Sequence, residues 1–222
     1  MLSHPPEIDR PEPRWPAMVA ALSAVALHFA LPEKLRVGPP WALGAIVVGL
    51  ILAAHVARWS GNHKANNFIA FAILGVLTIG MGFGVFRLIE GVVHHSAEAY
   101  DLLRAASVLW ATNVIVFATW YWRLDGGGPN QRERHDVHTR GAFLFPQMTF
   151  ESPASADMTI AEEQQWRPRF VDYLFVAFNT STAFSPTDAP VLTPWAKIAM
   201  MVQATISFTT VVLIAARAVN IL

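Results

Sequence analysis

Long stretches of this chain contain no charged residue, and that pattern limits its fold more than any other feature. The segments from Pro16 to Leu31 and from Pro40 to Ala57 carry none. Across the chain 54% of residues are hydrophobic and only 14% are charged, whereas soluble domains contain about 25% charged residues. Because such runs approach the length of a helix that crosses a hydrocarbon core of about 30 Å, we predict that lipid is the main solvent of this protein.

The runs predict an all-α fold, a polytopic membrane helical bundle with about five spanning helices and one short re-entrant segment of pore-helix type. The fourth run ends in Trp120, Tyr121 and Trp122, a cluster typical of a membrane interface. The predicted helices run from about Pro16 to Leu31, Pro40 to Ala57, Phe68 to Val93, Leu103 to Trp122, Phe170 to Phe184, and Pro194 to Leu222.

Polar segments divide the chain into four parts. Residues 1–15 form a polar, proline-rich arm that lacks the features of a secretory signal. We expect a four-helix transmembrane region over 16–123, a polar loop over 124–167, and a hairpin over 168–222 made of a short helix, a turn and the last transmembrane helix. A loop of roughly 40 residues is unusually long for a small bundle.

Composition argues against several classes of function. The formal net charge is zero and the chain contains no cysteine, so we predict no nucleic-acid partner and no thiolate metal site. The histidines have no spacing that fixes a metal or haem site, and we predict neither metal nor cofactor. No nucleophile, base and orienting group form a recognisable motif, so we do not expect an enzyme. The histidines considered are His28, His55, His94 and His95.

The segment from Phe170 to Phe184 is the most informative part of the chain. It holds 15 residues, which reach only about 22 Å as a helix and cannot span a membrane alone. Pro186 and Pro190 interrupt the chain directly after it. A short helix, a broken polar turn and a spanning helix predict a re-entrant loop, whose carbonyl end favours a cation. The candidate constriction residues are Asn179, Thr180, Ser181, Thr182, Ser185, Thr187 and Asp188.

Two further polar groups lie in predicted spans. Gln203, Ser207 and Thr210 share one face of the last helix, either as the lining of a pore or cavity or as hydrogen-bonding contacts between helices. Arg87 and Glu90 are three residues apart and are candidates for a buried ion pair. If that helix ends at the membrane interface, the pair is an ordinary interfacial ion pair without a functional role.

The block DYLFVAFNTSTAFSPTDAPVLTPWAKI resembles the pore helix, filter and inner-helix start of the two-helix potassium-channel pore domain. Thr182 and Asp188 stand near the two ends of that family's filter, and Pro190 matches the turn that follows. The filter glycines are missing, and Pro186 has a fixed φ and no N–H. The resemblance therefore implies a degenerate pore domain without a potassium-selective filter.

The chain more closely resembles a group of uncharacterised bacterial multi-pass membrane proteins, known as a domain of unknown function. The shared stretches are WYWRLDGGGP, FLFPQ, DYLFVAFNTSTAFSPTDA and ARAVNIL. This resemblance implies a multi-pass protein of the bacterial inner (plasma) membrane. It implies no activity.

Two cues to membrane orientation disagree. The positive-inside rule places the N-terminus and the long loop in the cytoplasm, whereas a potassium-channel-like arrangement places the re-entrant loop outside. Three resolutions stay open: the short segment spans after all, the re-entrant loop is inverted, or the mixed-charge loop escapes the rule. The basic residues on the predicted cytoplasmic side are Arg10, Arg14, Arg58, Lys64, Arg123, Arg132, Arg134, Arg140, Arg167 and Arg169, against Lys34, Arg36 and Arg104 opposite.

Three functions follow as hypotheses. The first is a homo-oligomeric, pore-domain-like protein that binds or conducts a small cation, since one hairpin per chain requires several copies to enclose a pore. The second is a non-conducting membrane scaffold or accessory subunit. The third is a small transporter or a membrane enzyme.

Overall fold

The fold is taken from a computed structural model of the chain, which describes residues 12–36, 38–132, 141–149, 167–182 and 189–219. These residues are almost entirely helical, and their one isolated β-bridge joins Phe143 to Val191. The helices are α1 (Trp15–Phe29), α2 (Pro40–Trp59), α3 (His63–Val93), α4 (Ala99–Leu124), α5 (Pro129–Arg132), α7 (Phe170–Thr182) and α8 (Pro194–Val219), with 3-10 turns η2 (Glu33–Leu35), η3 (Asp125–Gly127) and η4 (Pro146–Met148).

Four of these helices, α2, α3, α4 and α8, are long and apolar enough to cross a membrane. The shorter apolar helix α1 has 15 residues and reaches only about 22 Å. The sequence predicts about five spanning helices, and α1 is the one of them that is shorter than the four long helices. Helix α7 is shorter still, with 13 residues.

Helix boundaries follow local chemistry. Pro40 opens α2, where a missing N–H costs nothing. Helix α3 begins at His63, before the predicted start at Phe68, because the Asn62 side chain caps it by accepting a 3.0 Å hydrogen bond from the Ala65 N–H. The polar residues that read as loop in the sequence are therefore the first turn of a helix.

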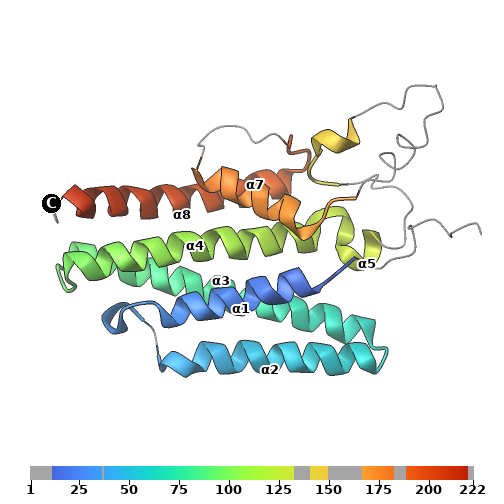
Figure 1. The fold of residues 1–222 in the computed structure, drawn as a ribbon, viewed down its shortest axis with the longest axis horizontal. Coiled ribbons are helices and arrows are strands. Elements are labelled where there is room, and N and C mark those ends of the chain that lie inside the picture. The colour runs from blue at the N-terminus through green and yellow to red at the C-terminus, as the bar shows by residue number, and fades with distance from the viewer. Residues whose placement is uncertain (1–11, 37, 133–140, 150–166, 183–188, 220–222) are drawn as a thin grey trace, which may run out of the picture.

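Helices α1 to α4 run alternately up and down (Figure 1). The start of α1, the end of α2, the start of α3 and the end of α4 lie at the end of the bundle that carries α5, here called the α5 end. There Arg123 donates a 2.6 Å hydrogen bond to Asn67 Oδ1. At the opposite end, here called the far end, Arg87 donates to the Lys34 carbonyl at 3.0 Å.

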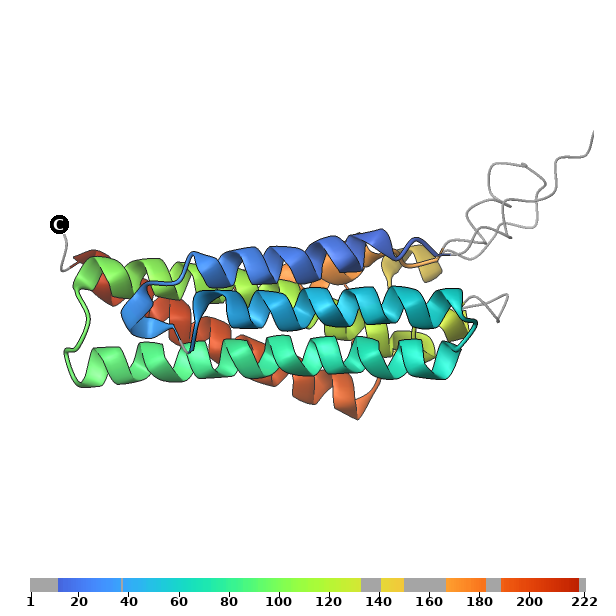
Figure 2. The same ribbon diagram turned by 90° about the horizontal axis from the view of Figure 1, so that it is seen from below.

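Helices α7 and α8 both start at the α5 end and both run antiparallel to α4 (Figures 1 and 2). Tyr173, near the start of α7, bonds Asp125 just beyond the end of α4. Near the other end of α7, the Ser181 carbonyl lies 3.5 Å from Trp110 Nε1, close to the middle of α4. The chain then returns to the α5 end, where the Leu192 N–H donates to the Ala142 carbonyl at 2.8 Å. Helix α7 thus stops partway along the bundle.

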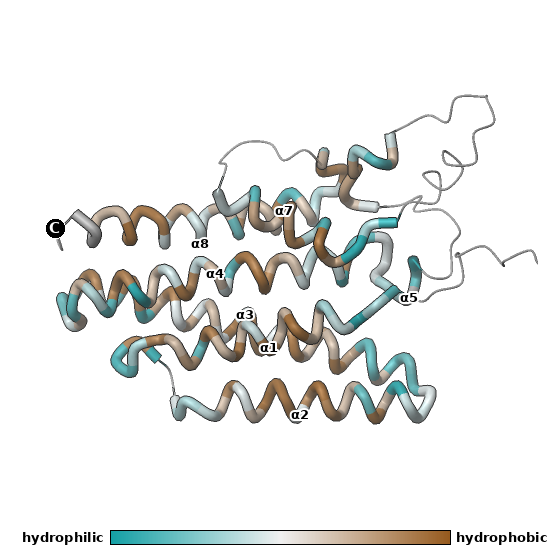
Figure 3. Tube along the Cα trace, in the orientation of Figure 1, coloured by the Kyte–Doolittle hydropathy of each residue, from teal (hydrophilic) through white to brown (hydrophobic). Residues whose placement is uncertain are grey.

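Helix α4 is the central helix and contacts α1, α3, α7 and α8. Figure 2 shows α8 crossing the bundle obliquely. Large apolar side chains also cover the outside: Leu52 is 62% exposed, Ile79 61% and Phe208 57%. Figure 3 shows this hydrophobic character along the middle of the helices, with hydrophilic residues toward their ends. An apolar outer surface of this extent matches a lipid environment.

Candidate functional site

The end of α7 holds four of the predicted constriction residues, and the other three, Ser185, Thr187 and Asp188, lie outside the described residues. Asn179 is half-buried, Thr180 and Ser181 are buried, and Thr182 is exposed. The Thr180 and Thr182 hydroxyls donate to the carbonyls of Val176 and Phe178 on their own helix, at 2.8 and 2.9 Å. This back-bonding is the usual way for a threonine hydroxyl to be satisfied inside a helix.

Gln203 joins α8 to both α7 and α4. Its Nε2 donates to the Ala177 carbonyl at 2.7 Å and to Ser181 Oγ at 2.8 Å. Its Oε1 accepts a 2.6 Å hydrogen bond from the Tyr121 hydroxyl. The Gln203 side chain is fully buried, so these three bonds supply its amide with partners from within one chain.

Ser207 and Thr210 continue the same buried face of α8. Ser207 Oγ accepts a 2.8 Å hydrogen bond from Asn113 Nδ2, which also donates to the Gln203 carbonyl at 3.1 Å. The Thr210 hydroxyl donates to the Ile206 and Ser207 carbonyls of its own helix. Within one chain, this geometry favours hydrogen bonds between helices over the lining of a cavity for Gln203 and Ser207, and Thr210 is buried on the same face.

The opposite face of α8 is largely exposed. Met201 is 60% exposed and Phe208 57%, and Thr205 between them is exposed. The Thr205 hydroxyl donates to the Met201 carbonyl at 2.8 Å. If α8 borders a shared pore, this face is the one available to line it.

Arg87 and Glu90 form the ion pair that their spacing predicts, with Arg87 Nη1 2.7 Å from Glu90 Oε2. The pair is not buried within the chain, because the two side chains are 41% and 37% exposed. It lies near the end of α3, where Arg87 also holds the Lys34 carbonyl at 3.0 Å. The geometry therefore favours an ordinary ion pair at the end of a helix over a buried functional site.

A second polar cluster, here called the end cluster, closes the α5 end. It consists of Glu12, Trp122, Asp125, Arg132 and Tyr173. Arg132 pairs with Glu12 at 3.0 Å, with side chains only 5% and 14% exposed. It also donates to the carbonyls of Trp122 and Asp125 at 2.9 and 2.6 Å. Its guanidinium lies 5.4 Å from the centre of the Tyr173 ring, a cation–π distance.

The end cluster and the neighbouring ring of Phe143 bring together three stretches singled out in the sequence. WYWRLDGGGP supplies Trp122 and Asp125, and FLFPQ supplies Phe143, whose ring centre lies 6.2 Å from that of Tyr173 at the start of the DYLF block. Asp125 Oδ1 accepts from the Ala142 N–H, which ties the FLFPQ stretch to the end of α4. These stretches thus fix where α7 begins.

Sequence reasoning missed Asn113, Tyr121 and Asp125 as structural polar groups. Asn113 could have been found, since it is a lone amide in an apolar run. Tyr121 reads as an interfacial residue but is fully buried against Gln203. The role of Asp125 could not be predicted from its sequence neighbours, because its partners Ala142 and Tyr173 are distant in sequence.

Over the described ranges, no three His, Asp or Glu side chains come together as a metal site. No protein-family model matches the chain, and neither a curated protein nor a solved structure matches it. The resemblances stated from the sequence therefore stay predictions.

Proposed function

We propose that this chain is a multi-pass membrane protein of the bacterial inner membrane whose α4, α7 and α8 form one subunit of a pore-domain-like homo-oligomer. The assembly binds or conducts a small cation. The observation that carries this proposal is the arrangement of α7, which enters from the α5 end, stops partway along α4 and is followed by a return to the same end. A short helix ending inside a bilayer is a common way to present backbone carbonyls to an ion.

The constriction in this proposal is the segment 179–188. The carbonyl end of α7 carries a partial negative charge of about −0.5, and Asp188 adds a carboxylate a few residues later. Both favour a cation over an anion. Pro186 supports a filter other than the potassium-selective kind.

The exposed face of α8 takes the role of pore lining. Gln203 and Ser207 make hydrogen bonds to α4 and α7, so they hold the hairpin in place, and Thr210 is buried on the same face. Met201, Thr205 and Phe208 face outward and are available to border a shared axis.

The distribution of basic residues supports an inverted re-entrant loop. Arg14, Arg58 and Arg123 lie at the α5 end, the end from which α7 enters. The positive-inside rule puts that end in the cytoplasm. The loop then enters from the cytoplasmic side, opposite to the potassium-channel arrangement.

Oligomeric state and ion flux test the proposal together. Native mass spectrometry in mild detergent should give a closed oligomer, and vesicles containing it should pass potassium or sodium. Asp188→Asn and Thr182→Ala should each lower flux about tenfold, which corresponds to about 1.4 kcal/mol of lost cation stabilisation. Asp101→Asn, at the far end of α4, is the matched control. A monomer without flux, or equal flux in all variants, contradicts the proposal.

A non-conducting membrane scaffold is the second candidate. The observation that favours it is the Gln203 amide, whose hydrogen bonds are all made within one chain. In a scaffold the hairpin is a packing motif and needs no partner copies. A stable monomer that retains the Gln203 contacts and passes no ions supports this candidate over the pore.

A further inference from the structure

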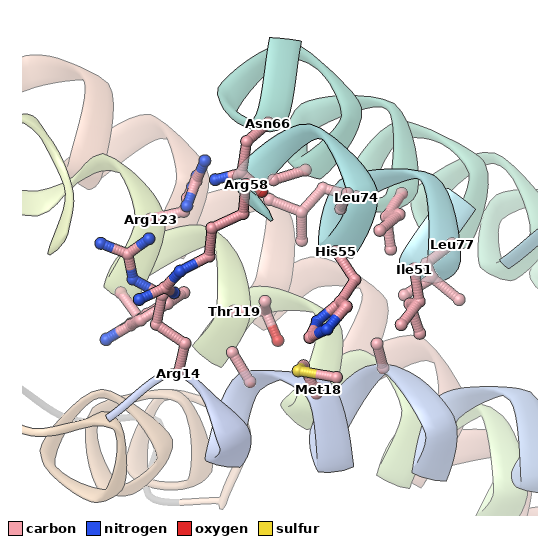
Figure 4. A pocket seen from close by; sticks show the side chains of 16 residues that line it. Arg14, Met18, Ile51, His55, Arg58, Asn66, Leu74, Leu77, Thr119 and Arg123 are labelled. Carbon is pink, nitrogen blue, oxygen red and sulfur yellow. The ribbon is translucent and has the colours of Figure 1, made fainter. Parts of the chain in front are cut away.

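A pocket of about 150 Å³ lies between the first four helices, near the α5 end and away from the α7–α8 hairpin (Figure 4). Its walls are mostly apolar, with Met18 from α1, Ile51 from α2 and Leu77 from α3. This volume is well above the roughly 10–15 Å³ that one water needs. The pocket therefore has room for a small polar group and a few methylenes, but not for a whole lipid.

The polar lining of the pocket is entirely cationic or neutral. Figure 4 shows Arg14, Arg58 and Arg123 gathered on one side, with Ile51 and Leu77 on the other. His55 and Asn66 also line the pocket, and none of the lining residues is acidic. The pocket thus has a basic part and an apolar part, which suits a ligand with an anionic head and a hydrocarbon tail.

Two of the basic groups in the pocket, Arg58 and Arg123, have few hydrogen-bond acceptors. Arg123 is 6% exposed, so its guanidinium has little contact with water. Its hydrogen bond to Asn67 uses only one of its five N–H groups. Within the described part of the chain, neither Arg58 nor Arg123 forms an ion pair. The side-chain amide of Asn66, a residue only 8% exposed, makes no hydrogen bond there either.

We propose that this pocket binds an anionic phospholipid, with the headgroup phosphate between Arg58 and Arg123 and the first methylenes along Met18 and Ile51. Arginine binds phosphate oxygens through paired hydrogen bonds, and basic pockets between membrane helices on the cytoplasmic side bind anionic headgroups. The rest of the lipid would lie along α2, the least buried of the four long helices. This inference rests on the membrane placement proposed above and is independent of the pore.

Native mass spectrometry of the full chain tests the site, with phosphatidylglycerol titrated against phosphatidylcholine in mild detergent. Phosphatidylglycerol should bind at least tenfold more tightly. Arg58→Gln should weaken its binding about tenfold, and Arg58 is exposed, so the fold should persist. Lys64→Gln removes an equal charge at the same end outside the pocket and should change nothing.

A second pair of variants tests the volume of the pocket rather than its charge. Ala54 lines the pocket, and Ala54→Leu should fill it and weaken phosphatidylglycerol binding. Ala53→Leu places the same side chain on the neighbouring exposed position and is the control.

Equal affinity for the two lipids, or equal effects within either pair of variants, overturns the proposal. Displacement of the lipid by millimolar inorganic phosphate also overturns it, since the site would then take a free anion. Ion flux is a separate measurement, so failure of the lipid-site proposal can be distinguished from failure of the pore proposal.

Discussion

The Tyr173 hydroxyl donates a 2.7 Å hydrogen bond to Asp125 Oδ2, and this contact joins the start of α7 to the end of α4. Both residues are fully buried. The other oxygen of the same carboxylate accepts from the Ala142 N–H. A single buried carboxylate therefore holds α7, α4 and the FLFPQ stretch in one arrangement, and it sets the point from which the short helix enters the bundle.

Removal of the Tyr173 hydroxyl should loosen this junction. Tyr173→Phe leaves a buried carboxylate oxygen without one of its partners, and such a loss costs about 1–3 kcal/mol. The free energy of unfolding in detergent should fall by that amount, as followed by helical circular dichroism. Tyr100→Phe is the matched control, because Tyr100 is 66% exposed. Equal stability of the two variants would show that the Asp125 contact contributes nothing.

The hydrogen bonds of Gln203 should stabilise the hairpin. Gln203→Leu removes three side-chain bonds that reach α4 and α7. At about 0.6 kcal/mol per contact in membrane proteins, the loss should be about 2 kcal/mol. Thr205→Val is the control on the same helix, because Thr205 is exposed and bonds only its own helix. Hydrogen exchange of the α7 amides should rise in Gln203→Leu alone, and unchanged exchange would mean that packing by itself holds α7.

The long helices could be predicted from the sequence because their signal is local. Charge-free runs mark α2 and α3, and the prolines that begin α2 and α8, Pro40 and Pro194, mark their first turns. Spacings along α8 place Gln203, Ser207 and Thr210 together, and all three are fully buried. Periodicity identifies a shared face, but it does not say whether that face meets a pore or a neighbouring helix.

The candidate site depended on contacts that leave no local pattern. Tyr121 and Gln203 are 82 residues apart, and Glu12 and Arg132 are 120 apart. Each of these side chains has several plausible roles when it is read from its neighbours alone. The short length of α7 was more predictable, because the apolar run is short and the prolines that follow it are visible in the sequence.

The glycines after α4 should be essential for the end cluster. Gly128 has a φ of +87°, and a Cβ there would lie 2.6 Å from the Arg123 carbonyl oxygen. Gly128→Ala therefore combines backbone strain with a clash against main chain, and it should cost roughly 2–4 kcal/mol. Gly61→Ala also has a positive φ, of +71°, but open space around the new methyl group, so it has strain without the clash and should cost less. Similar thermal stability of the two variants would mean that the backbone near Gly128 relaxes easily.

The absence of native cysteine makes the direction of entry of α7 directly measurable by single-cysteine labelling. Arg169 and Lys197 are exposed residues that flank the start of α7 and the start of α8, and Ser60 lies at the same end after α2. Arg169→Cys, Lys197→Cys and Ser60→Cys should all react with an impermeant maleimide from one side of sealed vesicles. Glu98→Cys, at the far end between α3 and α4, should react only from the other side. Labelling of Arg169→Cys and Lys197→Cys from opposite sides would mean that the segment between them crosses the bilayer. The partial negative charge at the end of α7 would then lie at a membrane surface, where water screens it and it cannot select a cation.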